Sequence, residues 1–310
     1  RMSEKIYPIG IQNFEKIRKE GYFYIDKTAL IYRLVKTGSY YFLSRPRRFG
    51  KSLLISTLDA YFRGEKELFK GLAIEKLEKD WVKRPVLHID LNIGKYDAPD
   101  SLDKILNEAL VKWETVFGTG AGESTLALRF KGVVERAYKQ SGQRVAILVD
   151  EYDKPLLQAI GDEDLQREYR NTLKPFYGVL KTMDGCIQFA MLTGVTKFGK
   201  VSVFSDLNNL EDLSMWNEYV TLCGVSNQEI HEFAKAQSMT YDEVNTELEK
   251  WYDGYHFTHN SIGMYNPFSL LSAFKRKDFS NYWFETGTPT YLVELLKRNH
   301  YDLERMASEE

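Results

Sequence analysis

The chain has 310 residues, a formal net charge of -2 and 43% hydrophobic residues, which suits one large domain or two moderate ones. This charge balance excludes a global attraction to nucleic acid or anionic membrane, and two cysteines exclude a disulfide framework. The sequence has no signal-peptide core and no apolar run of membrane-spanning length, so we expect a cytoplasmic protein with no membrane partner.

In chain order, apolar runs typical of buried strands alternate with longer amphipathic stretches. The predicted strands are Tyr40–Ser44, Pro85–Leu91, Arg144–Asp150, Cys186–Thr193 and Glu218–Leu222. Apolar residues at three-to-four spacing predict helices at Ser101–Thr115, Leu126–Gln140 and Asp164–Met183, the last kinked or split by Pro175. The alternation predicts an α/β fold, with a parallel sheet flanked by helices.

The pattern changes near residue 226. There it predicts helices at Gln228–Lys235 and Tyr241–Trp251 and a short extended stretch at Ile262–Tyr265. We therefore predict a core domain over residues 1–225 and a small second domain over 226–310. The charged ending "LERMASEE" has no terminating feature, and we expect the chain to be a fragment.

A Gly-Lys-Ser sequence follows the first predicted strand, in "YYFLSRPRRFGKSLL". In a phosphate-binding loop, Gly50 would allow close backbone approach, Lys51 would reach the β- and γ-phosphates, and Ser52 would ligand Mg²⁺. The usual pattern G-x-x-x-x-G-K-[ST] has glycine where this chain has Arg45. A basic surface turn is the alternative interpretation.

The strand in "RVAILVDEYDKP" ends in Asp150 and Glu151, as in a Walker B motif. Asp150 would hold Mg²⁺ and Glu151 would deprotonate the attacking water, although acidic residues are also common where a helix begins. The strand Pro85–Leu91 between the two motifs favours the additional-strand class of P-loop NTPases, in which a catalytic Glu follows the metal Asp. The joint occurrence of both motifs predicts nucleotide binding.

The next strand ends in "AMLTGVTKFGK", which places Thr193 or Thr196 at the same edge of the sheet. A hydroxyl there could sense the γ-phosphate or fix the lytic water. Threonine is also an ordinary strand residue.

These residues resemble bacterial AAA-ATPase-like proteins, relatives of archaeal ATPases and of STAND signalling NTPases. The resemblance rests on the following segments: "PIGIQNFEKIRKEGYFYIDKT", "SRPRRFGKSLL", "ILVDEYDKP", "LTGVTKFGKVSVFSDLNNLEDLS", "WYDGYHF" and "YNPFSLL". Archaeal relatives commonly have G-P-R-R-x-G-K-[ST] in the loop, from which only Arg45 departs. The family therefore implies a variant phosphate loop, with nucleotide contacts from Arg47, Arg48, Phe49, Gly50, Lys51, Ser52 and Leu53.

The resemblance implies ATP and Mg²⁺ as cofactors, ATP and ADP as ligands, and a small helical or winged-helix lid as the second domain. It also implies a P-loop ATPase, slow in isolation, whose catalytic residues are Glu151, Lys51 and Thr193 and whose metal ligands are Ser52 and Asp150. Hydrolysis would drive a conformational switch or an effector; the alternative is a STAND-like switch with little hydrolysis.

A homo-oligomer and a C-terminal or separate nuclease effector stay open, whereas nothing in this chain supports nucleic-acid binding. The N-terminal Ile9, Phe14 and Tyr24 would either cover the adenine or pack in the core.

Overall fold

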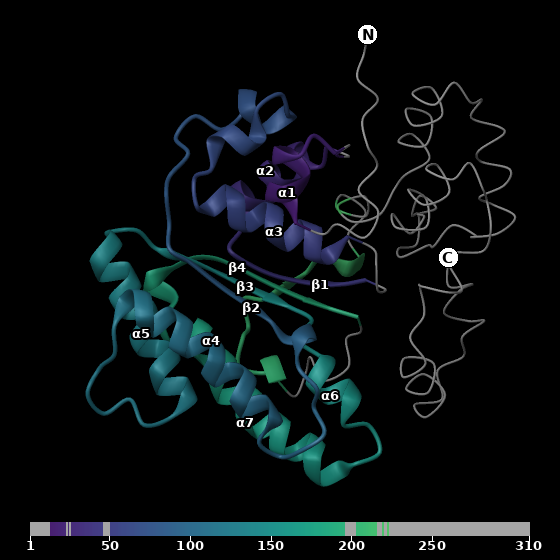
Figure 1. The fold of residues 1–310 in the computed structure, drawn as a ribbon, viewed down its shortest axis with the longest axis vertical. Coiled ribbons are helices and arrows are strands. Elements are labelled where there is room, and N and C mark those ends of the chain that lie inside the picture. The colour runs from purple at the N-terminus through teal and green to yellow at the C-terminus, as the bar shows by residue number, and fades with distance from the viewer. Residues whose placement is uncertain are drawn as a thin grey trace, which may run out of the picture.

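The computed structural model describes residues 13–22, 24, 26–45, 50–195, 203–215, 219 and 222 (Figure 1). Its helices are α1 (Phe14–Lys19), α2 (Thr28–Thr37), α3 (Lys51–Phe62), α4 (Ser101–Phe117), α5 (Leu126–Ser141), α6 (Lys154–Gln158) and α7 (Glu163–Thr182). Its strands are β1 (Tyr40–Ser44), β2 (Val86–Asp90), β3 (Val145–Asp150), β4 (Ile187–Gly194) and β5 (Glu211–Asp212). The elements predicted at Gln228–Lys235, Tyr241–Trp251 and Ile262–Tyr265 lie outside the described residues.

The strands form one parallel sheet in the order β2-β3-β4-β1-β5, so the predicted α/β class is confirmed. β4 lies between β1, which precedes the Gly-Lys-Ser sequence, and β3, which ends in Asp150. The central strands β1, β3 and β4 are covered on both faces, which explains why they read as continuous apolar runs.

The prediction of a fifth strand at Glu218–Leu222 was wrong for the two residues of that range that the structure describes. Tyr219 lies in a 3₁₀ turn and Leu222 in a bend, and both are buried in the core. The fifth strand is instead β5, which pairs with Tyr41 and Phe42 of β1. Tyr219 and Leu222 are apolar in the sequence because they are buried, although neither lies in a strand.

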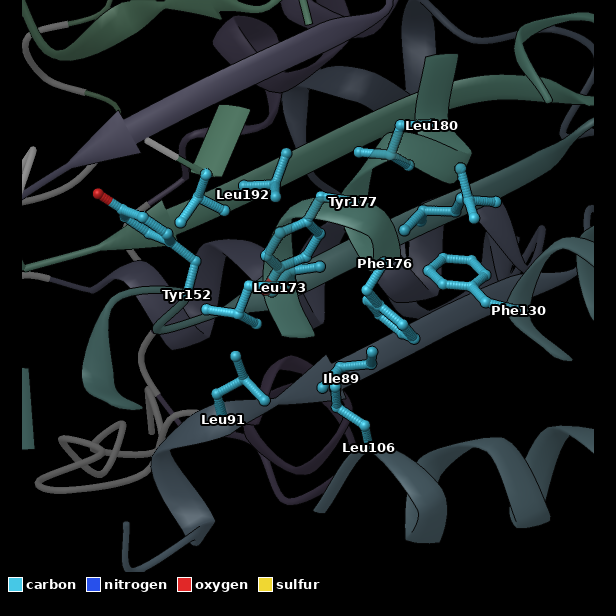
Figure 2. Close-up of a cluster of buried hydrophobic side chains, with 14 of the residues drawn as sticks. Ile89, Leu91, Leu106, Phe130, Tyr152, Leu173, Phe176, Tyr177, Leu180 and Leu192 are labelled. Carbon is cyan, nitrogen blue, oxygen red and sulfur yellow. The ribbon is translucent and has the colours of Figure 1, made fainter. Parts of the chain in front are cut away.

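Alternate residues of the central strands face two separate hydrophobic clusters. Ile147 and Leu192 belong to the cluster under α4, α5 and α7, shown in Figure 2, whereas Leu148 and Met191 belong to the cluster under α1, α2 and α3. Figure 1 shows these two groups of helices on opposite faces of the sheet. The site at the strand ends is therefore built on strands fixed from both sides.

Two further expectations concern individual residues. α7 continues through Pro175 without splitting, and Leu173, Phe176 and Tyr177 around the proline are all buried in the core. This packing on both sides of the proline supports the helix where one backbone hydrogen bond is lost.

Phe14 is fully buried, with its ring 5.2 Å from that of Tyr24, which favours the core interpretation of these two residues; Ile9 lies outside the described residues.

Among the helices of the described residues, we find none with the length and apolar character needed to span a membrane.

Candidate functional site

The carboxyl ends of β1, β3 and β4 lie along one edge of the sheet, which is where open α/β sheets bind ligands. At this edge Gly50 has φ 83° and ψ 15°, in the left-handed region, and forms the N-cap of α3. Glycine adopts this conformation without the steric cost of a Cβ atom. α3 therefore starts at Lys51, with the positive end of its dipole and its first amide groups near the end of β1.

Lys51 is a buried cation at the start of α3, with only 3% of its surface exposed. Its Nζ donates a hydrogen bond to the backbone carbonyl of Arg45 at 2.6 Å and lies 3.7 Å from Oε1 of Glu151. Such partners are required because an isolated buried ammonium group would be very costly to desolvate. Lys51 therefore connects the end of β1 with the end of β3.

Asp150, the last residue of β3, accepts hydrogen bonds from two hydroxyl groups. Ser52 Oγ donates to Oδ2 at 2.6 Å, and Thr193 Oγ1 donates to Oδ1 at 2.7 Å. Carboxylate and hydroxyl oxygens are the hard ligands that Mg²⁺ prefers, and Ser52 and Asp150 present them side by side. These two residues therefore have the chemistry to hold a Mg²⁺ ion.

Glu151 combines a strained backbone with an incompletely paired carboxylate. Its φ is 59°, in the left-handed region, which costs a non-glycine residue about 1–3 kcal/mol. Only 6% of its surface is exposed, and its Oε2 has no hydrogen-bond partner among the described residues. Its amide donates to Thr193 Oγ1 at 3.3 Å. A strained backbone and a buried oxygen without a partner in the described part of the chain make Glu151 a candidate functional residue.

The structure thus brings together five of the residues that the sequence singled out: Lys51, Ser52, Asp150, Glu151 and Thr193. The side chain of Leu53 packs against the core cluster under α1–α3, so a contact from Leu53 to a ligand would involve its backbone amide. Arg47, Arg48, Phe49 and Thr196 lie outside the described residues.

Comparison with known proteins identifies the family. A family model described as "Predicted AAA-ATPase" matches residues 8–204, which include every site residue named above. The chain belongs to this AAA-ATPase-like family. It is also 43% identical over 297 residues to the "Uncharacterized protein in vnfD 5'region" of Azotobacter chroococcum mcd 1. That alignment covers 95% of this chain and 57% of the relative's length.

Sequence reasoning did not find two acidic residues of this candidate site. Asp90 ends β2 and is paired in register with Asp150. Burial raises the pKa of Asp90, and the nearby carboxylates of Asp150 and Glu151 raise it further, against the lowering effect of the Asn92 amide. Its position next to the last residue of the predicted strand Pro85–Leu91 was a usable signal, but its proximity to Asp150 depends on the strand order.

Asp153, the second of the two, is fully buried near the end of β4. Both of its carboxylate oxygens accept from the amide of Val195, at 3.3 and 3.1 Å. Gly194 is also closely packed here, because an added Cβ atom would lie 2.4 Å from the ring of Tyr152. Asp153 therefore fixes the backbone that follows Thr193 in β4.

Proposed function

We propose that this chain binds ATP together with Mg²⁺ at the carboxyl edge of its sheet and hydrolyses the ATP. The observation that carries the proposal is the direct contact of Lys51, Ser52, Asp150 and Thr193 with one another or with Glu151. These side chains come from α3, β3 and β4, which are far apart in the sequence. A basic surface turn would not require a buried lysine or a paired hydroxyl and carboxylate.

In this proposal each residue has a separate task. Lys51 is the cation for the phosphates, and the α3 amide groups from Lys51 to Leu53 add hydrogen-bond donors. Ser52 and Asp150 are the metal ligands, and Glu151 orients and deprotonates the attacking water. When bound, Mg²⁺ supplies charge neutralisation at the phosphate oxygens.

Thr193 fixes the Asp150 carboxylate by donating to its Oδ1 at 2.7 Å, and it also accepts from the Glu151 amide. Arg47, Arg48 and Phe49 complete the proposed nucleotide contacts.

The proposed organisation is an AAA-like core over residues 1–225 and a lid domain over 226–310. Turnover in the core would control a conformational switch or an effector, either attached or separate, and a nuclease is one such effector. Within the P-loop NTPases, the position of β4 between β1 and β3 and the Asp150-Glu151 pair favour the additional-strand, catalytic-Glu class.

A nucleotide-gated switch with little hydrolysis is the second candidate. It is favoured by the 3.7 Å contact of Glu151 with Lys51, which engages the proposed base with a cation. Measuring ATPase activity across a concentration series, with molecular mass in parallel, separates the two candidates. Turnover near ~1–10³ s⁻¹ by a monomer would support the self-sufficient ATPase and contradict the switch.

The binding proposal is tested by calorimetric titration of Lys51→Ala with ATP and Mg²⁺. Loss of a charge-assisted contact should weaken affinity by about a hundredfold. Lys104→Ala is the matched control, because Lys104 is an exposed lysine on α4 whose side chain is 74% exposed. Equal affinity of wild type and Lys51→Ala would contradict the phosphate-loop assignment.

A further inference from the structure

Arg45 occupies the position where phosphate loops usually have their first glycine, and its side chain is buried with 1% of its surface exposed. The Nη1 atom donates to the carbonyl of Ser44 at 2.9 Å and to the carbonyl of Ser214 at 2.8 Å. The guanidinium group therefore binds the backbone of Ser214, which follows β5 in the chain. Through Nη1, the buried side chain serves as a donor to backbone carbonyls.

The backbone of Arg45 makes two further connections. Its amide donates to the carbonyl of Gly194 at the end of β4 at 3.1 Å, and its carbonyl accepts from Lys51 Nζ at 2.6 Å. One residue thus contacts the proposed phosphate-binding lysine, the strand that carries Thr193, and the segment Glu211–Met215.

The segment Glu211–Met215 is joined to β1 at several points. β5 pairs with Tyr41 and Phe42, and Ser214 Oγ accepts from the Ser44 amide at 2.8 Å. Ser214 is itself buried, and its amide donates to Asp212 Oδ1 at 2.9 Å. A change at the Arg45 peptide therefore reaches this segment through direct hydrogen bonds.

We propose that Arg45 is a positioning residue that couples Lys51 to the segment Glu211–Met215, so that nucleotide binding changes the stability of that segment. The inference rests on the proposed nucleotide-binding function. An anion that attracts Lys51 Nζ competes with the Arg45 carbonyl for the same ammonium group. Because coupling between two sites is reciprocal, a change in the segment also alters nucleotide affinity.

The side-chain chemistry explains why arginine suits this position. A guanidinium group carries five N–H donors in a fixed plane and stays charged, so it can bond two carbonyls while buried. Glycine would leave the Ser214 carbonyl without this donor, and lysine would place a rotatable ammonium group in its place. Replacing Arg45 with the usual motif glycine should therefore uncouple Lys51 from the segment Glu211–Met215.

The experiment measures hydrogen exchange of the amides in 211–215, with and without ATP and Mg²⁺, alongside calorimetric affinity. In the wild type, nucleotide should change the exchange of this segment. In Arg45→Gly and Arg45→Met, the segment should exchange about tenfold faster without nucleotide and should no longer respond to it. Arg45→Lys keeps the charge and should show a reduced response, and it serves as the folded variant if the others do not fold.

The matched control is Arg136→Met, because Arg136 on α5 is paired with Glu123 at 2.7 Å and lies outside the proposed site. It should keep the full nucleotide response. A full wild-type response in any folded Arg45 variant would overturn the coupling, as would a wild type that binds ATP without any change in 211–215. A wild type that binds no ATP would instead refute the proposed function and the coupling with it, a result visible in the calorimetry alone.

Discussion

Glu78 and Glu151 are both buried glutamates with a lysine nearby, but they differ in their hydrogen-bond donors and in their backbone conformation. Glu78 is 4% exposed and accepts hydrogen bonds from the Tyr61 hydroxyl and from the amides of Lys79 and Asp80. Lys36 Nζ lies 3.3 Å from its carboxylate. The buried charge of Glu78 is thus fully compensated by donors from several elements.

Among the residues that the structure describes, Glu151 has one ion pair, with Lys51 at 3.7 Å, and no hydrogen-bond partner for Oε2; its backbone is left-handed. A buried carboxylate in this condition costs stability, whereas Glu78 contributes to it. The comparison indicates that Glu78 connects the region after Ala73–Lys76 to α2 and α3. Our proposal assigns Glu151 a functional role instead.

The largest expected effect is on hydrolysis. Glu151→Gln keeps shape and hydrogen-bonding capacity but removes the proposed base, so ATP hydrolysis should fall by a factor of about 10² or more. Affinity for ATP should change much less, and both quantities should be measured in one preparation. Glu78→Gln is the counterpart and should keep wild-type turnover under conditions where it is folded. Equal loss of binding and hydrolysis in Glu151→Gln would point to a structural or metal-binding role.

The second expected effect is a loss of stability when Glu78 is changed. Glu78→Gln removes a charge that several donors contact, so the free energy of unfolding should drop by about 2 kcal/mol. Urea denaturation at neutral pH measures it, and Glu108→Gln on the exposed surface of α4 should barely change the same quantity. If Glu78→Gln were as stable as the wild type, the distinction between the two glutamates would fail.

The difference in free energy of unfolding between wild type and Glu78→Gln should also depend on pH. Burial alone would raise the pKa of Glu78, but hydrogen bonds from Tyr61, the Asp80 amide and Lys36 lower it below the usual 4.5. A lowered pKa in the folded state means that the stabilisation is present above about pH 4.5 and is lost as the pH falls below it. The gap between wild type and Glu78→Gln should therefore shrink in denaturation experiments toward pH 3.5. A gap that stays constant over this range would contradict the charge-based explanation.

Much of the fold could be predicted because the central strands are buried on both faces. β1 was predicted with its observed bounds, Tyr40–Ser44, and β3 within one residue, because each reads as one apolar run. β5 has only two residues, Glu211 and Asp212, and pairs at the edge of the sheet, so no apolar run marks it. Its position comes from tertiary pairing with β1.

The candidate site likewise has features that the sequence predicts and features that depend on the tertiary structure. Residue type and spacing indicated Lys51, Ser52 and Asp150, because phosphate and Mg²⁺ chemistry needs those groups at strand and helix ends. The direction of the Arg45 side chain and the proximity of Asp90 to Asp150 follow from strand order and register. Sequence spacing carries no information on either.

The smallest effect tests the backbone at Glu151 itself. Glu151→Gly and Glu151→Ala both delete the carboxylate and its contact with Lys51, so their difference reports the backbone conformation alone. At φ 59°, glycine avoids the steric cost of Cβ, and Glu151→Gly should be more stable than Glu151→Ala by about 1 kcal/mol. The same pair at Glu108, inside α4, should show the opposite order, with alanine more stable by about 1 kcal/mol. Chemical denaturation of the four variants measures both differences. If alanine were the more stable residue at position 151 as well, the backbone of Glu151 would not be strained, and only its side chain would have unusual surroundings.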